Sequence, residues 1–244
     1  MSRFNDADDP RRRLLIQALA AGMFTTVAGG QVLAQQLFGS TPRKLEGGRS
    51  IYRISGSVTV DGQPATLETR ITPSSVVETG RDGEIVFAVG ENAFIMRPNS
   101  RMALEPSKRE TGLMSGLNLL AGKVLSVFAK SRDPIRMNTK VASIGIRGTG
   151  VYMEAEPDQT YFCTCYGVAD IASNADPESK ETVAAKYHDK PLYILADQPA
   201  GKSIRNAPFI NHTDQELMLI ETLVGRNPPF VFPKDDYAGP RRNY

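Results

Sequence analysis

Short runs of β-prone residues, separated by turn-forming pairs, are the feature that most limits how this chain can fold. Asp61-Gly62, Thr79-Gly80 and Asp82-Gly83 are such pairs, because glycine readily adopts the left-handed conformations that tight turns require. Turns about eight to twelve residues apart are typical of β-sandwiches, rolls and barrels. The sequence therefore predicts a mainly β fold, a sandwich or β-roll of short antiparallel strands. The first strands are expected at Ile54–Val60, Ala65–Ile71, Ser75–Thr79, Glu84–Val89, Ala93–Met96 and Arg101–Glu105.

The densest apolar region, Leu113–Phe128, is predicted to form two strands rather than a helix. Gly112, Gly116 and Gly122 would each cost a helix about 1 kcal/mol relative to alanine. Ala121-Gly122-Lys123 is instead suited to a turn between two strands. The later strands are expected at Pro134–Asn138, Lys140–Ile144, Val151–Ala155, Thr160–Cys165 and Val168–Ile171, with a sharp glycine bend at Gly145–Gly150.

The region after residue 172 contains the clearest helix signal. Thr213-Asp-Gln-Glu216 is a capping box, in which the threonine hydroxyl and the glutamate carboxylate bind free backbone amides at a helix start. Apolar residues follow at helical spacing and Gly225 is suited to end the helix, so one C-terminal helix is predicted near residues 214–224. Ser173–Lys186 is predicted to be a loop with a short helix, and Pro191–Ala196 a strand.

An export signal is predicted near the N-terminus. Arg11-Arg12-Arg13-Leu14-Leu15 resembles the twin-arginine motif, in which paired arginines, here Arg11 and Arg12, precede apolar residues. The apolar run Leu14–Ala28 is shorter than the ~20 residues that a membrane span needs. Val32-Leu33-Ala34 offers a cleavage site after Ala34. We therefore expect export to the bacterial periplasm; the alternative is a cytoplasmic amphipathic helix that begins with arginines.

Charge and motif content argue against several classes of function. The formal net charge is only +2, and the basic residues do not form the stripe interleaved with aromatic residues that nucleic-acid binding requires. Ala196–Ser203 nominally fits a phosphate-binding loop, but Ile204–Pro208 cannot form the helix that such a loop needs. No Gly-x-Ser-x-Gly nucleophile motif accompanies either histidine. We therefore expect neither nucleic-acid binding nor an enzyme, and no catalytic residue is predicted.

Several segments occur in the order in which FecR-type domains carry them. These are Gly56-Ser-Val-Thr-Val-Asp-Gly, Val77-Glu-Thr-Gly, Arg97-Pro-Asn-Ser-Arg-Met-Ala-Leu, Ala121-Gly-Lys-Val and Ile146-Arg-Gly-Thr-Gly-Val-Tyr. Residues 50–172 thus resemble a FecR-type domain, and Arg147, Gly148 and Thr149 form the most specific part of the motif. Family members that regulate iron-dicitrate uptake bind a sigma factor through a cytoplasmic segment, have one membrane helix, and contact an outer-membrane transporter with this domain.

This chain departs from that plan, because a cleavable signal takes the place of the cytoplasmic segment and membrane helix. The resemblance therefore implies an exported periplasmic binding or signalling module that contacts a protein or cell-envelope partner, rather than direct regulation of a sigma factor. The expected segments are a signal peptide at 1–34, a flexible leader at 35–49, the FecR-like β domain at 50–172, a C-terminal extension at 173–230 and a loose tail at 231–244.

The two cysteines and two histidines of the chain are the candidate site for chemistry. Cys163 and Cys165 are two residues apart, so both sulfurs point to the same face of a strand. With His188 and His212 they would complete a tetrahedral donor set for zinc or another thiophilic metal. Two alternatives stay open. The cysteines could be buried free thiols, which is the first preference. They could also form a redox pair. Their Cα atoms are expected ~6.6 Å apart, near the upper limit for a disulfide, so a bridge between them would be strained and easily reduced.

Overall fold

A computed structural model of the protein describes residues 43–110, 112–131 and 133–229. The predicted signal peptide, with Arg11 and Arg12, and the predicted tail at 231–244 lie outside the described residues, as does most of the predicted leader. From Lys44 onward, the described residues belong to one compact unit.

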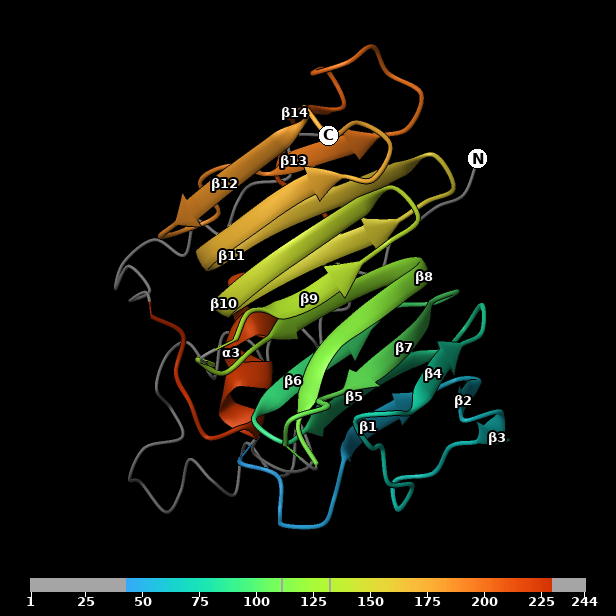
Figure 1. Cartoon of the computed structure of the whole chain (residues 1–244). Coiled ribbons are helices and arrows are strands. Elements are labelled where there is room, and N and C mark those ends of the chain that lie inside the picture. The colour runs from blue at the N-terminus through green and yellow to red at the C-terminus, as the bar shows by residue number, and fades with distance from the viewer. Residues whose placement is uncertain (1–42, 111, 132, 230–244) are drawn as a thin grey trace. The chain divides into compact units, whose positions relative to one another are not determined.

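The described chain is mainly β, as predicted, with one helix near its C-terminal end (Figure 1). Fourteen strands join in a single sheet, whose main path runs β14-β13-β11-β10-β9-β8-β7-β4-β2-β3. All pairings are antiparallel except β8 with β9. The strands are β1 Ile51–Ser55, β2 Val58–Val60, β3 Gln63–Pro64, β4 Val76–Thr79, β5 Glu84–Val89, β6 Asn92–Met96, β7 Arg101–Pro106, β8 Met114–Val127, β9 Ile135–Asn138, β10 Ala142–Ala155, β11 Gln159–Ser173, β12 Lys180–Ala185, β13 Leu192–Leu195 and β14 Ile204–Asn206.

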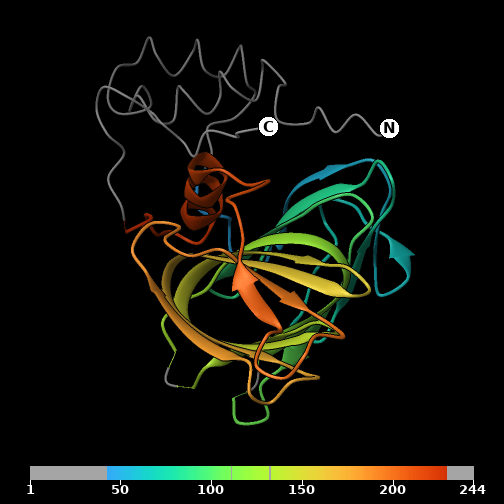
Figure 2. The same ribbon diagram turned by 90° about the horizontal axis from the view of Figure 1, so that it is seen from above.

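The sheet curls on itself (Figure 2). It buries side chains on both of its faces. The larger core fills the inside of the curl and includes Phe94, Val151 and Phe162. A second core lies on the opposite face, where Leu125, Tyr152, Cys163 and other apolar residues pack under the helix. Because side chains alternate between the two faces of a strand, the central parts of β10 and β11 supply both cores and are buried at every position from Thr149 to Ala155 and from Thr160 to Tyr166.

Helix α3, Asp214–Leu223, confirms the predicted C-terminal helix and its cap. The Thr213 side chain accepts a hydrogen bond from the Glu216 amide, and the Glu216 side chain accepts one from the Thr213 amide. Leu217, Ile220 and Leu223 pack into the second core. The helix therefore covers the outer face of the sheet beside β5, β6 and β8.

Three predicted turns or bends are continuous strands in the structure. β8 runs through Ala121-Gly122-Lys123 without turning, because Gly122, at φ 88°, marks the place where the strand exchanges neighbours. It pairs with β7 before this point and with β6 and β10 beyond it. The predicted bend at Gly145–Gly150 is a bulge within β10, which the positive φ of 61° at Gly148 permits. β11 likewise joins the strands predicted at Thr160–Cys165 and Val168–Ile171.

Three local predictions were wrong. Ala65–Ile71 is not a strand, because Thr66 and Thr69 bind nearby backbone amides with their own side chains, and such bonds compete with the strand ladder. Ser173–Lys186 contains strand β12 instead of a short helix, since the edge of β11 supplies its hydrogen bonds. The strand predicted at Ile54–Val60 is two strands, divided at Gly56, whose φ is 63°.

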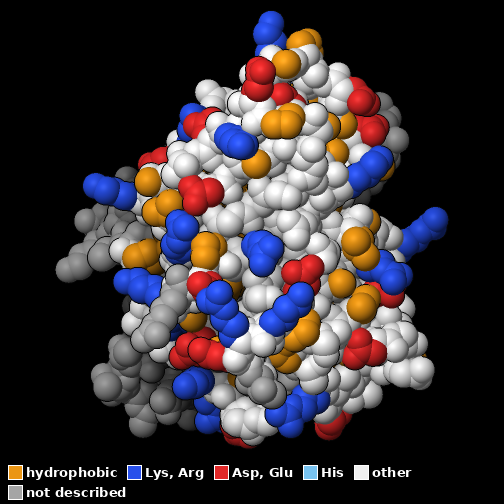
Figure 3. Space-filling model, in the orientation of Figure 1, with side chains coloured by type: hydrophobic (Ala, Val, Ile, Leu, Met, Phe, Trp, Pro, Cys, Tyr) orange, Lys and Arg blue, Asp and Glu red, His pale blue; other side chains and the backbone are white. Residues whose placement is uncertain are grey.

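Positive and negative side chains are interspersed on one face of the molecule. On the face shown in Figure 3, lysine and arginine side chains alternate with aspartate and glutamate side chains. This distribution agrees with the small net charge of the sequence. Within the described residues, no helix has the length and apolarity needed to cross a membrane.

Candidate metal centre

Strand β11 presents both cysteines to the second core. Cys163 lies directly opposite Tyr152 of β10, and residues paired in this way share one face of the sheet. Cys165, two positions along the strand, points the same way. Both side chains are fully buried and both are free thiols. Both sulfurs therefore lie on one face of the strand, as the sequence predicted.

The connection between β12 and β13 brings His188 to these sulfurs. The carboxylate of Asp189 accepts hydrogen bonds from the amides of Lys186 and Tyr187, at 2.6 and 3.2 Å, and thereby forms a tight turn. The His188 amide donates to the Cys165 carbonyl at 2.9 Å. His188 has a φ of 48°, a conformation that costs a non-glycine residue about 1–3 kcal/mol and is concentrated at functional sites.

The segment before helix α3 brings His212. The Tyr161 hydroxyl donates to the Pro208 carbonyl at 3.0 Å and accepts from the Ile210 amide at 3.3 Å. Asn211, at φ 61°, donates from its side chain to Glu154 at 2.7 Å. The His212 ring stacks on Tyr152 with a centroid separation of 4.5 Å. These contacts fix the path of the backbone and the plane of the imidazole ring.

The four side chains meet in one buried cluster, although the histidines lie far from the cysteines in sequence. Cys163 Sγ is 3.4 Å from His188 Nδ1, Cys165 Sγ is 3.4 Å from His212 Nε2, and the two ring nitrogens are 3.3 Å apart. All four donor atoms lie within 4.8 Å of one another. A tetrahedral zinc ion with bonds of about 2.0–2.3 Å would separate its ligand atoms by roughly 3.3–3.8 Å. The three short distances fit this spacing, and the cluster has the donors of a Cys2His2 zinc site.

The outer nitrogen of each histidine is already occupied. His188 Nε2 lies 2.9 Å from Asp214 Oδ1, and Asp214 Oδ2 accepts from the Tyr187 hydroxyl at 2.6 Å. His212 Nδ1 lies 2.7 Å from the Ile210 carbonyl, so it must be the protonated nitrogen there. Outer hydrogen bonds of this kind fix the tautomer and turn the lone pair of the other nitrogen toward a metal. Sequence reasoning missed Asp214, because a helix-capping pattern does not show which distant side chain its first residue will meet.

The pKa values of the two thiols are shifted in opposite directions. Burial acts to raise the pKa of Cys163, but hydrogen bonds with Cys165 and the two histidines outweigh it and hold that pKa well below the ordinary value. Burial and the neighbouring Cys163 sulfur raise the pKa of Cys165. Burial acts to lower the pKa of His188, but Asp214 and Cys163 raise it to about 9. The negative charge of the Cys163 sulfur is thus balanced by a proton on His188, which a bound cation would displace.

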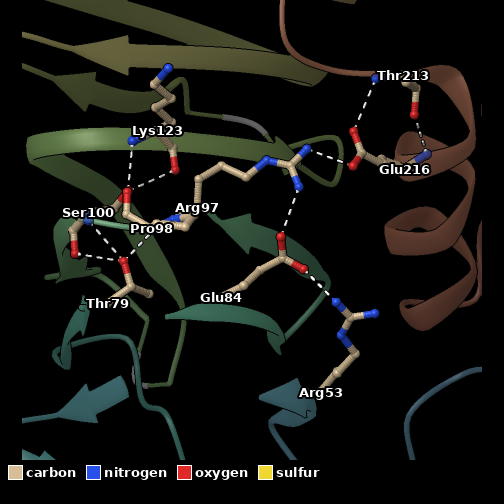
Figure 4. Close-up of polar contacts among 9 residues, drawn as sticks. All are labelled: Arg53, Thr79, Glu84, Arg97, Pro98, Ser100, Lys123, Thr213 and Glu216. Atoms are coloured by element: carbon tan, nitrogen blue, oxygen red, sulfur yellow. Dashed lines mark hydrogen bonds and ion pairs between the residues drawn. The ribbon is translucent and has the colours of Figure 1, made fainter. Parts of the chain in front are cut away.

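A largely buried ion-pair network contacts the first turn of helix α3 (Figure 4). Arg97 contacts Glu84 at 3.1 Å and Glu216 at 2.7 Å, and Glu84 also contacts Arg53 at 2.8 Å. Burial acts to lower the pKa of Arg97, but the two carboxylates raise it above its ordinary value, so the guanidinium stays charged. Since Glu216 also caps the helix at Thr213, this network positions the residue that follows His212.

The other predicted site residues do not belong to the cluster of four donors. Arg147 is half-exposed and pairs with Asp170 across β10 and β11 at 3.3 Å, while Gly148 and Thr149 form the bulge described above. The loop-like stretch Ala196–Ser203 connects two strands, and β14 follows it in place of a helix. The fold therefore brings together all four predicted metal ligands and leaves the FecR-like motif outside that site.

The chain matches no known family model and no curated protein. It is similar to two crystal structures of a proposed anti-sigma factor from Parabacteroides distasonis ATCC 8503, solved at 2.50 and 1.65 Å resolution. The TM-scores are 0.44 and 0.43, the identity is 10%, and the match covers 54% of this chain and 58% of the other. The chain thus matches somewhat more than half the length of that protein.

Proposed function

We propose that this chain is a metal-binding β protein that holds one zinc ion, or another thiophilic metal, between Cys163, Cys165, His188 and His212. The observation that carries the proposal is the pair of histidines whose outer nitrogens are already hydrogen-bonded, to Asp214 and to the Ile210 carbonyl. A histidine that only fills a core has no need of such orientation toward two sulfurs. Two thiolates with two imidazoles favour zinc among the common divalent metals.

The proposed ion has a structural role. All four ligands are buried, and a closed set of four protein ligands is typical of structural zinc, whereas catalytic zinc keeps one position for water. Cys163, His188 and Asp214 stand in the order of a nucleophile, a base and an orienting acid, but all three side chains are buried, whereas a catalytic nucleophile has to meet its substrate. We therefore place no catalytic step at this cluster.

Beyond the metal, we propose that the chain acts as an exported binding or signalling module in the periplasm. The twin-arginine motif at Arg11 and Arg12 supports export, and the resemblance of residues 50–172 to FecR-type domains supports contact with a protein or cell-envelope partner. Replacing Arg11 and Arg12 by lysine should leave the precursor in the cytoplasm. Undiminished export of this double variant would refute the export part of the proposal.

The metal proposal is tested by elemental analysis of the full chain purified from cells without added metal. We expect about one zinc per chain and loss of that zinc in Cys163→Ser. Thr164→Ser is the matched control, because Thr164 lies between the two cysteines and its side chain points to the opposite face of β11. Wild-type protein with two titratable thiols and no stoichiometric metal, even after incubation with zinc, would overturn the proposal.

A further inference from the structure

The ligands of the proposed metal site belong to two parts of the chain. Cys163 and Cys165 lie within the sheet, and the backbone of His188 is hydrogen-bonded to Cys165, so three ligands move with the sheet. His212 belongs instead to the segment 207–213, which leads into helix α3. A metal ion at this site therefore joins the sheet to the helix-bearing segment.

Asp214 makes a second connection at the same place. It is the first residue of helix α3 and is almost fully buried, at 1% exposure. One carboxylate oxygen contacts His188 at 2.9 Å and the other accepts from the Tyr187 hydroxyl at 2.6 Å. A cation bound on the far side of the His188 ring polarises the imidazole and strengthens its hydrogen bond to a carboxylate. The charge of the metal thus acts on the first turn of the helix.

The helix covers an apolar part of the sheet. Leu217, Ile220 and Leu223 pack against residues of β5, β6 and β8. The apolar sheet residues of this second core on those three strands are Val86, Ala88, Ala93, Ile95, Leu125 and Val127. Opening of the helix-bearing segment would expose this surface to water, which is unfavourable in proportion to its area. The segment therefore needs strong attachments at its N-terminal end.

We propose that the metal is a latch for helix α3, with Asp214 as the positioning residue that couples the metal to the helix. The inference rests on the proposed metal-binding function. When the metal leaves, the segment loses the cross-link through His212 and the strengthened bond between His188 and Asp214. The ion pair of Arg97 with Glu216 persists, so loss of metal raises the frequency with which the segment opens and does not detach it. Metal supply thereby controls access to the apolar sheet face beneath the helix.

Hydrogen exchange on the full chain tests the latch without any substitution. The protein is stripped with a chelator, one half is reloaded with zinc, and amide exchange is compared between the two forms. We expect the amides of residues 207–223 to exchange at least about tenfold faster without metal, and the core amides of β8 and β10 to be unchanged. Equal exchange at 207–223 in a protein shown to bind one zinc would overturn the latch while leaving the metal-binding function intact.

The role of Asp214 is tested by a matched pair of isosteric variants in the same helix. Asp214→Asn should weaken zinc affinity about 10- to 100-fold, as loss of an outer-shell partner does, and should shift the visible absorption bands of the Co²⁺-loaded protein. Glu221→Gln is the control, because Glu221 lies two turns along the helix, about 10 Å from Asp214, and binds Tyr166 and Arg226 instead. It should leave the affinity and the Co²⁺ spectrum unchanged. Equal metal affinity in both variants would refute the coupling, and failure of the wild-type protein to bind zinc would refute the function itself.

Discussion

Substitution of Arg97 by methionine tests the ion-pair network at the first turn of helix α3. The Arg97 side chain is 13% exposed, and its partners Glu84 and Glu216 are 8% and 9% exposed. Methionine fills a similar volume but leaves both carboxylates with less compensation of their charge. Removing one partner of a buried ion pair costs about 3–5 kcal/mol. Glu84 keeps Arg53 and Glu216 keeps the Thr213 amide, so the lower end of that range, about 3 kcal/mol, is expected.

The measurement is equilibrium unfolding of the zinc-loaded full chain in urea. The slope of the unfolding free energy against urea concentration should be the same in wild type and variant, which shows that the denatured state is unchanged. Arg101→Met is the matched control. Arg101 also pairs with a glutamate, Glu78 at 3.1 Å, but these side chains are 52% and 38% exposed, and exposed pairs contribute about 1 kcal/mol or less. If Arg97→Met lowered the free energy of unfolding by no more than Arg101→Met does, the reasoning from burial would be wrong.

Three further predictions follow from other contacts. Zinc binding should release roughly two protons near pH 7, because Cys165, whose pKa is raised, and His188, whose pKa is about 9, both hold protons that the metal displaces. Its apparent affinity should then rise with pH between about 6 and 9, and calorimetry in two buffers that gave no proton release would contradict this. Gly150→Ala should cost about 1–3 kcal/mol in urea unfolding, because the new Cβ would lie 2.3 Å from the Tyr166 ring, whereas Gly145→Ala, with its nearest atom at 3.8 Å, should be tolerated. Tyr152→Phe should cost about 1–3 kcal/mol by removing the buried hydrogen bond from its hydroxyl to Glu154 at 2.6 Å, and a change in unfolding free energy near zero would show that this bond has no net effect.

Local sequence patterns predicted much of the fold. Turn-forming pairs and β-prone runs indicated the fold class and most of the strands before β8, and the capping box at Thr213 located helix α3. These signals are local, because turn conformation and helix capping depend on residues within a few positions of one another. The predictions failed where a distant partner overrode the local preference. Gly122 lies within a strand because β10 takes over its pairing, and Ser173–Lys186 contains a strand because β11 offers an edge.

The candidate site was also predictable only in its local features. From the sequence alone, strand alternation places Cys163 and Cys165 on one face, and the chemistry of thiols and imidazoles identifies the metals that the four residues could bind. Their convergence depended on tertiary structure, since His188 is 25 residues from Cys163 and His212 is 47 residues from Cys165. Asp214 was recognisable only as a helix start, and its contact with His188 arises from the docking of α3 on the sheet. Residue spacing determines which side chains share a face within one strand, whereas the folding of the whole sheet decides which separate segments meet at that face.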